Sequence, residues 1–186
     1  MVYNEERVLK GCCKGKSVAQ RQLYEYFAPK MLVVSLRYTS GRLEAEDVLQ
    51  EAFIKVFDKI PQFRKECPLE AWIKRIVINT ALKQNRSKLY LYPAIDIDDL
   101  QEQKASEWSV NEYSWEELLA MIQQLAPRYR AVFNLYAIEG YQHKEIAEML
   151  NITEGTSKSQ YARAKILLRE MLQKEEDSAY GQALQN

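Results

Sequence analysis

The chain has 186 residues, which is enough for two small domains or one medium-sized domain, each with a modest core. Its 26 basic and 26 acidic side chains cancel, so net charge alone does not indicate a nucleic-acid-binding protein. The sequence contains no apolar run near the ~20 residues of a membrane span and no signal-like start, so membrane insertion is not expected.

Cysteine and histidine are too sparse for a metal centre or a disulfide framework. Cys12, Cys13 and Cys67 are odd in number and lack ligand spacing, and His143 is the only histidine. We therefore expect no metal, no cofactor and no catalytic residues. The default location for such a chain is the reducing cytoplasm.

Opposite charges are sorted along the chain. Residues 63–89 carry seven basic and two acidic side chains, a local balance of plus five. Residues 91–117 carry one lysine and eight acidic side chains, a balance of minus seven. Such sorting is typical of surfaces that are directed at partners.

The first helices follow from hydrophobic periodicity. Residues 5–13 are predicted to form a short helix, and Ser17 is placed to cap a second helix over 19–38. Pro29 lies inside this second pattern and predicts a kink or a break near Ala28.

The stretch 44–59 is predicted to form a helix with two different faces. Its apolar residues recur every three or four positions: Val48, Ala52, Phe53, Val56, Phe57 and Ile60. Its polar residues gather near the helix start: Glu44, Glu46, Asp47, Gln50 and Glu51. The macrodipole alone favours carboxylates there, but the basic helix that follows favours a partner-binding face.

A loop over 63–68 with Arg64 and Lys65 precedes a basic helix over 69–88. One side of this helix is predicted to be mainly apolar: Trp72, Ile73, Ile76, Val77, Thr80 and Ala81. Basic and amide side chains are interleaved with it: Lys74, Arg75, Asn79, Lys83, Gln84, Asn85 and Arg86. Such side chains could hold phosphates and an unpaired base, and a solvated basic face over a buried Trp72 explains the pattern equally well.

Periodicity fails over 90–113, which is acidic and contains a proline. We therefore predict an all-α fold of two small helical domains joined by an acidic linker. The expected divisions are a first domain, a linker, a second domain and a flexible tail: 1–90, 91–113, 114–176 and 177–186.

The second domain is predicted to contain a helix-turn-helix motif. Helices over 114–125, capped by Ser114, and 127–138 precede it. The motif itself comprises a helix over 142–150, a turn over 151–153 and a helix from 154 or 155 to about 172. The first of these two helices is expected to bury Ile146, Ala147 and Leu150. Small Ala147 allows a close helix crossing, and Asn151 tolerates a left-handed turn.

In such a motif the start of the second helix enters the major groove of DNA. Side chains with base-reading chemistry occur there: Thr156, Ser157, Lys158, Ser159, Gln160 and Arg163. Lys144, Lys165 and Arg169 are candidates for phosphate contacts. These residues favour DNA binding over a helical hairpin with a merely solvated polar face. His143 has no catalytic partner and is predicted to lie at the surface or to face a phosphate.

Three segments occur in this order: AEDVLQEAFIKVF, PLEAWIKRIVINTALKQNR and LAPRYRAVFNLYAIEGYQHKEIAEMLNITEGTSKSQYARAK. Together they resemble bacterial RNA polymerase sigma factors of the extracytoplasmic-function (ECF) group. The resemblance covers about residues 5 to 175. It implies that the helix over 44–59 docks on the clamp coiled coil of the largest polymerase subunit. The implied docking residues are Glu46, Asp47, Gln50, Glu51 and Phe53.

The resemblance also implies two DNA-binding sets. Residues for opening the −10 promoter element are Arg64, Lys65, Trp72, Lys74, Arg75, Asn79, Thr80 and Lys83. Residues for the −35 element, in a winged-helix-like region 4, are Lys144, Thr156, Ser157, Lys158, Ser159, Ala162 and Arg163. The implied partners are core RNA polymerase, through its clamp and flap, promoter DNA and an anti-sigma factor. Catalysis stays with the polymerase.

Three positions depart from the family's pattern. Ser157 stands where an apolar residue such as valine is usual, Gln160 replaces a common arginine, and Asn151 replaces a frequent glycine.

The predicted function is a sigma factor that directs transcription initiation at −10 and −35 elements. Two alternatives are an operator-binding helix-turn-helix regulator, with residues 5–90 for a ligand or dimerisation, and a helical adaptor that binds no nucleic acid.

Overall fold

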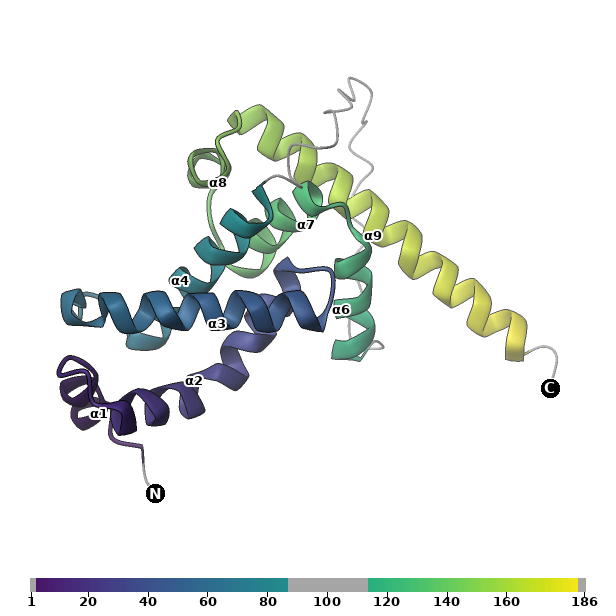
Figure 1. Ribbon diagram of the computed structural model, residues 1–186. Helices are drawn as coiled ribbons and strands as arrows, with labels where there is room; N and C mark the ends of the chain where they lie inside the picture. Colours follow the sequence, from purple (N-terminus) through teal and green to yellow (C-terminus); the bar gives the residue numbers. More distant parts are fainter. Residues whose placement is uncertain (1–2, 87–113, 184–186) are drawn as a thin grey trace. The chain divides into compact units, whose positions relative to one another are not determined.

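The computed structural model describes residues 3–86 and 114–183, with side chains up to residue 175 in the second range. All regular structure in these two ranges is helical, which confirms the all-α prediction (Figure 1). The chain divides into two compact units, Met1–Arg86 and Ser87–Asn186. The predicted linker over 91–113 lies outside the described residues. None of the described helices is both long and apolar enough to cross a bilayer.

The N-terminal unit is a bundle in which α2, α3 and α4 each pack against the other two (Figure 1). Its helices are α1 (Glu5–Cys12), α2 (Ser17–Tyr38), α3 (Arg42–Lys59), the 3₁₀ turn η1 (Ile60–Gln62) and α4 (Leu69–Gln84). The largest fully buried side chains of its core are Leu23, Phe27, Met31, Phe53, Ile60, Leu69, Ile73 and Ile78. The interdigitation of these apolar faces holds the bundle together.

The predicted break in α2 and the predicted cap by Ser17 are wrong, while the alternative of a kink at Pro29 stays a prediction. The helix does not break at Pro29 but continues to Tyr38. A proline removes one helical hydrogen bond, and burial of Phe27 and Met31 on either side of it offsets that loss. Ser17 does not cap the helix, because it is already its first residue; Lys16 is the N-cap and makes no side-chain cap bond.

The α1–α2 connection is a tight turn. Gly15 adopts a left-handed conformation with φ +68°. Small residues also let the two helices approach closely, because a Cβ added at Gly11 would lie 2.4 Å from Cβ of Ala19. Glycine at position 11 is therefore required by packing, not by backbone conformation.

The first described helix of the C-terminal unit is capped, as predicted. Ser114 and Glu117 form a reciprocal capping box at its start. The elements are α6 (Trp115–Gln124), α7 (Pro127–Phe133), the π-helical turn η3 (Asn134–Ile138), α8 (His143–Leu150) and α9 (Glu154–Ala183). One core cluster joins α6, α7 and α9, with Met121, Ile122, Leu125, Tyr129, Ala164 and Leu168 buried.

The helix α9 is longer than predicted. It runs to Ala183, so residues 177–183 of the predicted flexible tail are helical. Strong helix formers, namely glutamine, lysine, glutamate and alanine, occur between Leu172 and Ala183 and explain the extension. In the first unit, α3 begins at Arg42, two residues before the predicted start, and α4 ends at Gln84, four residues before the predicted end.

The substitution Gly11→Ala is expected to destabilise the α1–α2 pair by about 1–3 kcal/mol, because its methyl group would overlap Ala19. Hydrogen exchange of backbone amides in α1 and α2 measures the loss as a lower opening free energy. Gly41→Ala is the control, since a Cβ at Gly41 would meet nothing within 4 Å and its φ is 177°. Equal protection in both variants would contradict the close-packing account.

Candidate functional site

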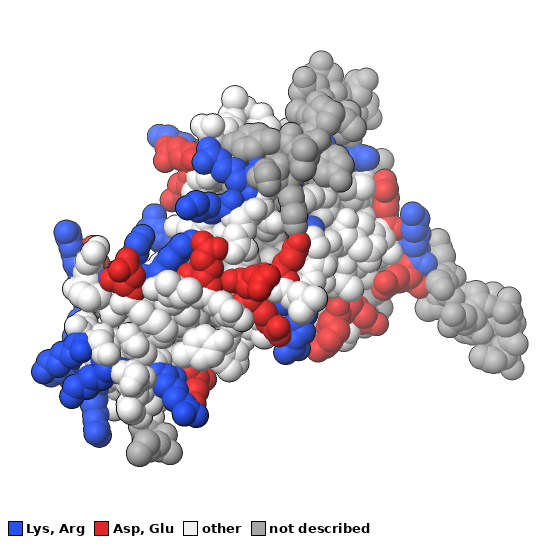
Figure 2. Space-filling model, viewed as in Figure 1, with Lys and Arg blue, Asp and Glu red and all other residues white. Residues whose placement is uncertain are grey.

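An acidic band follows the outer face of α3 (Figure 2). Its acidic residues are Glu44, Glu46, Asp47, Glu51 and Asp58. Asp47 and Gln50 are exposed, and Glu46 is half-buried and accepts a 2.8 Å ion pair from Arg42 Nε. Of the predicted docking residues on α3, Asp47 and Gln50 are therefore exposed, and Glu46 and Glu51 are partly exposed.

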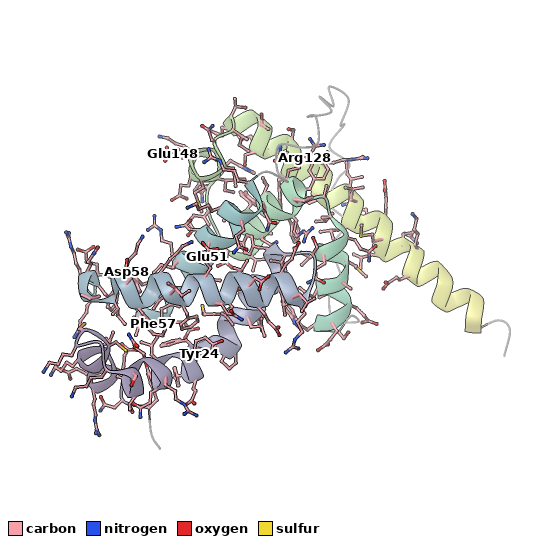
Figure 3. All side chains as sticks on the ribbon, in the orientation of Figure 1. Tyr24, Glu51, Phe57, Asp58, Arg128 and Glu148 are labelled. Atoms are coloured by element: carbon pink, nitrogen blue, oxygen red, sulfur yellow. The ribbon has the colours of Figure 1, made fainter. Side chains whose placement is uncertain are left out.

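Glu51 also ties α3 to α4. Its Oε1 accepts a 2.6 Å bond from Lys55 Nζ, and its Oε2 accepts a short bond from Gln84 Nε2. The same Lys55 Nζ donates to Thr80 Oγ1 at 3.1 Å. The hydrogen bond from Lys55, followed by that from Gln84, holds the pKa of the Glu51 carboxyl below its ordinary value. Figure 3 labels Glu51 on α3.

Phe53 is a correction to the predicted docking set. Only 2% of the residue is exposed, and its ring packs edge-on against Tyr24 at 4.8 Å and near Phe57 at 5.9 Å. Figure 3 labels Tyr24 and Phe57 on the side of α3 toward α2. Phe53 therefore supports the helix from inside and presents no surface to a partner.

Two exposed apolar residues on α3 were missed. Leu43 is 80% exposed and Ile54 is 69% exposed. With Asp47 and Gln50 they recur at intervals of four, three and four residues, so all four share one stripe. The signal in the sequence was the presence of large apolar residues on the polar side of an amphipathic helix.

The outer face of α4 presents one aromatic ring among polar side chains. Trp72 is half-buried, with its ring centroid 5.2 Å from that of Phe63. Arg75, Asn79 and Lys83 are exposed and follow Trp72 at three- or four-residue intervals, so they lie on the same side of the helix. This set combines phosphate-binding and base-contacting groups.

Two residues predicted for the same set lie elsewhere. Thr80 is 1% exposed, and its hydroxyl donates to Ile76 O at 2.8 Å while it accepts from Lys55. It is therefore part of the α3–α4 contact. Lys74 is two residues from Trp72, which places it roughly 160° around α4 from the face of Trp72 and Asn79.

The loop before α4 exposes Arg64 and Lys65, as the sequence suggested. Lys65 has φ +59°, an uncommon left-handed conformation for a lysine. Arg64 Nη1 lies 3.9 Å from Glu66 Oε1, which is a weak contact between exposed groups. The shape of the loop is thus set by its backbone more than by its ion pair.

The helix-turn-helix geometry is confirmed. Asn151 is left-handed with φ 54° and ψ 51°, and Ile152 N donates to Ala147 O at 3.0 Å. Both Ala147 and Ile146 are buried, as predicted. Thr153, which the sequence analysis overlooked, holds the start of α9, because its Oγ1 accepts from Thr156 N at 3.0 Å.

Ser157 is a correction to the predicted −35 set. Ser157 is completely buried, so it cannot meet a base edge. Its Oγ lies 2.9 Å from Nδ1 of His143, which joins the start of α8 to the start of α9. This pair explains how a polar residue occupies a position where the family usually has an apolar one. A buried hydroxyl is tolerated when it is hydrogen-bonded.

An aromatic cluster surrounds His143. Its imidazole stacks on Tyr136 with a centroid separation of 4.2 Å, and Tyr161 lies 4.5 Å from Tyr136. Burial, and then the nearby Lys158, hold the pKa of His143 below its ordinary value. The histidine is partly exposed, which agrees with the predicted surface position, while its ring stacks on Tyr136 and bonds to Ser157.

The first turns of α9 carry the remaining predicted contacts. Lys158 is exposed and forms a 2.7 Å ion pair with Glu154, which also feels the charge of Lys144. Ser159 is exposed, and Ala162 and Arg163 are partly exposed. Among the described residues, no three His, Cys, Asp or Glu side chains gather closely enough to hold a metal ion.

The stability of the C-terminal unit is expected to fall as the pH drops below about 6.5, because an unfolded chain protonates its histidine before the folded chain does. The contribution of neutral His143 to the free energy of unfolding is fully present above that pH. Urea unfolding of the untagged chain, followed by the methyl signal of buried Ile146, measures the change between about pH 7.5 and 5.5. His143→Phe keeps a stacking ring but cannot titrate, and should flatten the dependence. An equal fall in both proteins would contradict this assignment.

Two family models match these two units. Sigma-70 region 2 matches residues 23–88, which contain α3 and α4, and sigma-70 region 4 matches residues 115–168, which contain the helix-turn-helix. The matched segments occur in the order expected for one sigma factor.

Individual relatives agree with these matches. The chain is 28% identical to the ECF RNA polymerase sigma factor SigE of Mycolicibacterium smegmatis over 82% of the chain and 61% of that protein. It is 26% identical to the RNA polymerase sigma-H factor of Pseudomonas aeruginosa over 91% of the chain and 94% of that protein.

A solved structure shares the fold. It is the sigma factor RpoE of Bartonella quintana in complex with the anti-sigma factor NepR, with a TM-score of 0.52 and 22% identity over 82% of this chain and 96% of that chain. The two family matches and the relatives together show that the chain belongs to the ECF group of the sigma-70 family, the factors that direct promoter-specific initiation of transcription.

Proposed function

We propose that this sigma factor docks on core RNA polymerase through α3, opens the −10 element with α4 and the loop before it, and reads the −35 element with the start of α9. The observation that carries the proposal is the presence of both matched regions in one chain, each with the expected face exposed. The polymerase supplies the catalysis. The DNA that the polymerase transcribes lies in the bacterial cytoplasm, and we propose the same location for this protein.

The docking face combines charge with apolar anchors. Asp47 and Gln50 supply polar groups, and Leu43 and Ile54 supply apolar area on the same stripe of α3. Complementary charge speeds encounter and sets orientation, while buried apolar side chains supply much of the affinity. A positively charged coiled coil with apolar side chains, such as the polymerase clamp, fits both properties.

The −10 face would capture exposed bases. Trp72 offers an aromatic ring, and Arg75, Asn79 and Lys83 surround it with groups for phosphates and base edges. The loop with Arg64 and Lys65 precedes this face in the chain. Capture of flipped bases would offset the few kcal/mol needed to unstack each one.

The −35 contact requires one exchange of partners. Lys158 would leave Glu154 for a phosphate or a base edge. An exposed ion pair contributes about 0–1 kcal/mol, so the exchange costs little. Ser159 and Arg163 lie on the following turns of α9 and would extend the contact.

Two weak DNA-binding units become effective when they are joined. The linker predicted over 91–113 would raise the local concentration of the second unit once the first is bound. The second unit would rest on the polymerase flap.

The Bartonella quintana relative is seen with an anti-sigma factor, and we propose a protein inhibitor of the same kind for this chain. An operator-binding regulator is not favoured, because it would need no sigma region 2.

Replacing both Leu43 and Ile54 by alanine is expected to weaken association with core polymerase at least tenfold, because fully burying a leucine or isoleucine side chain contributes about 1.5–3 kcal/mol. Folding should be unaffected, since both side chains are exposed. Fluorescence anisotropy with labelled protein and core enzyme measures the affinity in the absence of DNA. Val18→Ala is the control, as Val18 is also 69% exposed but lies on α2. Unchanged affinity in the double variant would exclude this stripe from the docking surface.

Replacing both Lys158 and Arg163 by alanine is expected to reduce initiation roughly tenfold or more, at about 1–3 kcal/mol for each lost base contact. Core binding should be retained. Run-off transcription with core enzyme, on promoters whose start sites have been mapped with the wild-type chain, measures the effect. Lys174→Ala removes an exposed charge farther along α9 and serves as control. An equal loss of core binding would contradict the division of roles.

A further inference from the structure

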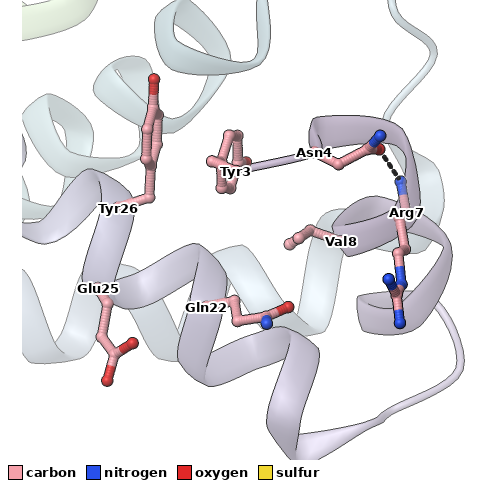
Figure 4. Close-up of a pocket in the computed structure, with 7 residues that line it drawn as sticks. All are labelled: Tyr3, Asn4, Arg7, Val8, Gln22, Glu25 and Tyr26. Atoms are coloured by element: carbon pink, nitrogen blue, oxygen red, sulfur yellow. Dashed lines mark hydrogen bonds between the residues drawn. The ribbon is translucent and has the colours of Figure 1, made fainter. Parts of the chain in front are cut away.

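A second basic surface lies outside both predicted DNA-binding sets. Two hollows of about 520 and 380 Å³ adjoin along the α1–α2 junction and share Asn4, Arg7 and Gln22 as lining residues. We refer to them together as the α1–α2 groove. Figure 4 shows the smaller hollow, with Arg7 and Gln22 on its walls.

The groove is strongly positive. Arg7, Lys10, Lys14 and Lys16 line its larger part, where Glu6 is the single acidic residue. Glu6 is paired with Lys10 at 2.9 Å, so three positive charges remain in excess in this larger part. The smaller part is lined by one acidic residue, Glu25, which is paired with Arg21 at 2.7 Å. Figure 2 shows lysine and arginine side chains gathered over α1 and the start of α2. An excess of this kind attracts a polyanion.

The charges are held on a fixed backbone. The N–H groups of Lys14 and Lys16 both donate to Gly11 O, each at 3.1 Å. Left-handed Gly15 lies between the two lysines, and the close Gly11–Ala19 contact anchors the turn beneath them. Because the backbone is already ordered, binding would restrict little more than the lysine side chains.

An aromatic pair closes the other end of the groove. Tyr3 and Tyr26 stack with their centroids 3.8 Å apart and their planes 6° apart. Tyr26 remains 45% exposed, and Lys30 Nζ lies 5.7 Å from its centroid. Basic side chains beside an exposed aromatic ring are typical of surfaces that follow a single nucleic-acid strand.

The groove adjoins the loop that we assign to the −10 element. The 3₁₀ turn η1, which ends directly before that loop, packs against α1, and Cys13 Sγ lies 3.9 Å from Ile60 O. Lys10, and then Lys65 of the loop, hold the pKa of the Glu6 carboxyl below its ordinary value. The loop therefore lies within electrostatic range of α1. A strand that leaves the loop on this side would pass directly over the basic residues.

We propose that the α1–α2 groove binds the phosphate backbone of the single promoter strand that leaves the −10 loop, and so extends the DNA contact beyond α4. This inference rests on the proposed function. Charged and amide groups form most of the lining, beside exposed Val18 and Tyr26. This composition favours a phosphate backbone with adjacent bases over an acidic protein segment.

The test compares Lys14→Gln/Lys16→Gln with a control of equal charge loss, Lys59→Gln/Lys174→Gln, whose residues are exposed and do not line the groove. Each variant is assembled with core polymerase and bound to a pre-opened promoter fragment. A second fragment carries neutral methylphosphonates in place of the phosphates adjoining the −10 element. Affinity is measured over a range of salt concentrations.

The groove variant should bind the normal fragment about tenfold more weakly, with a salt slope lower by about 1.4, because each single-strand phosphate contact contributes about 0.7. On the neutral fragment it should bind as the wild type does. Wild-type affinity and salt slope on the normal fragment, or an equal loss on both fragments, would overturn the groove assignment. Weaker binding of poly-L-glutamate with unchanged DNA affinity would assign the groove to a protein partner and also overturn it. If the wild-type holoenzyme starts no transcript, the proposed function itself fails.

Discussion

The requirement that α3 bury one face between α2 and α4 shapes the N-terminal unit. Ala45, Val48 and Ala52 are fully buried, and the small alanines let the neighbouring helices approach closely. Burial of this side leaves the opposite side of the same helix exposed. The residues that we assign to the polymerase therefore stand on an element whose position is fixed by the core.

Each surface assigned to DNA is supported in a similar way. Trp72 rests on Phe63, and the start of α9 is held by the Thr153 cap and the bond between His143 and Ser157. Such supports reduce the entropy that binding must remove from the contacting side chains. The exposed pair of Lys158 and Glu154 can then open at low cost without disturbing the motif.

Periodicity predicted the helices and the helix-turn-helix well, because the burial of an apolar stripe is a local property of the sequence. It could not tell which polar residues turn inward. Thr80 and Ser157 have base-reading chemistry, yet each is buried and bonds to a partly buried partner, Lys55 or His143, that is distant in the sequence. Leu43 and Ile54 were not predicted for the converse reason. They are apolar, yet they lie exposed on the polar side of α3, where periodicity predicts polar residues. Pro29 failed as a break signal because tertiary packing outweighed local propensity.

Site-specific photo-crosslinking tests the role of the outer face of α3 most directly. A photoreactive amino acid placed at exposed Gln50 is expected to crosslink to the largest subunit of core RNA polymerase. The same amino acid at Lys174, on α9, should not reach that subunit's clamp. A stable complex that yields no clamp crosslink from position 50 would contradict the account.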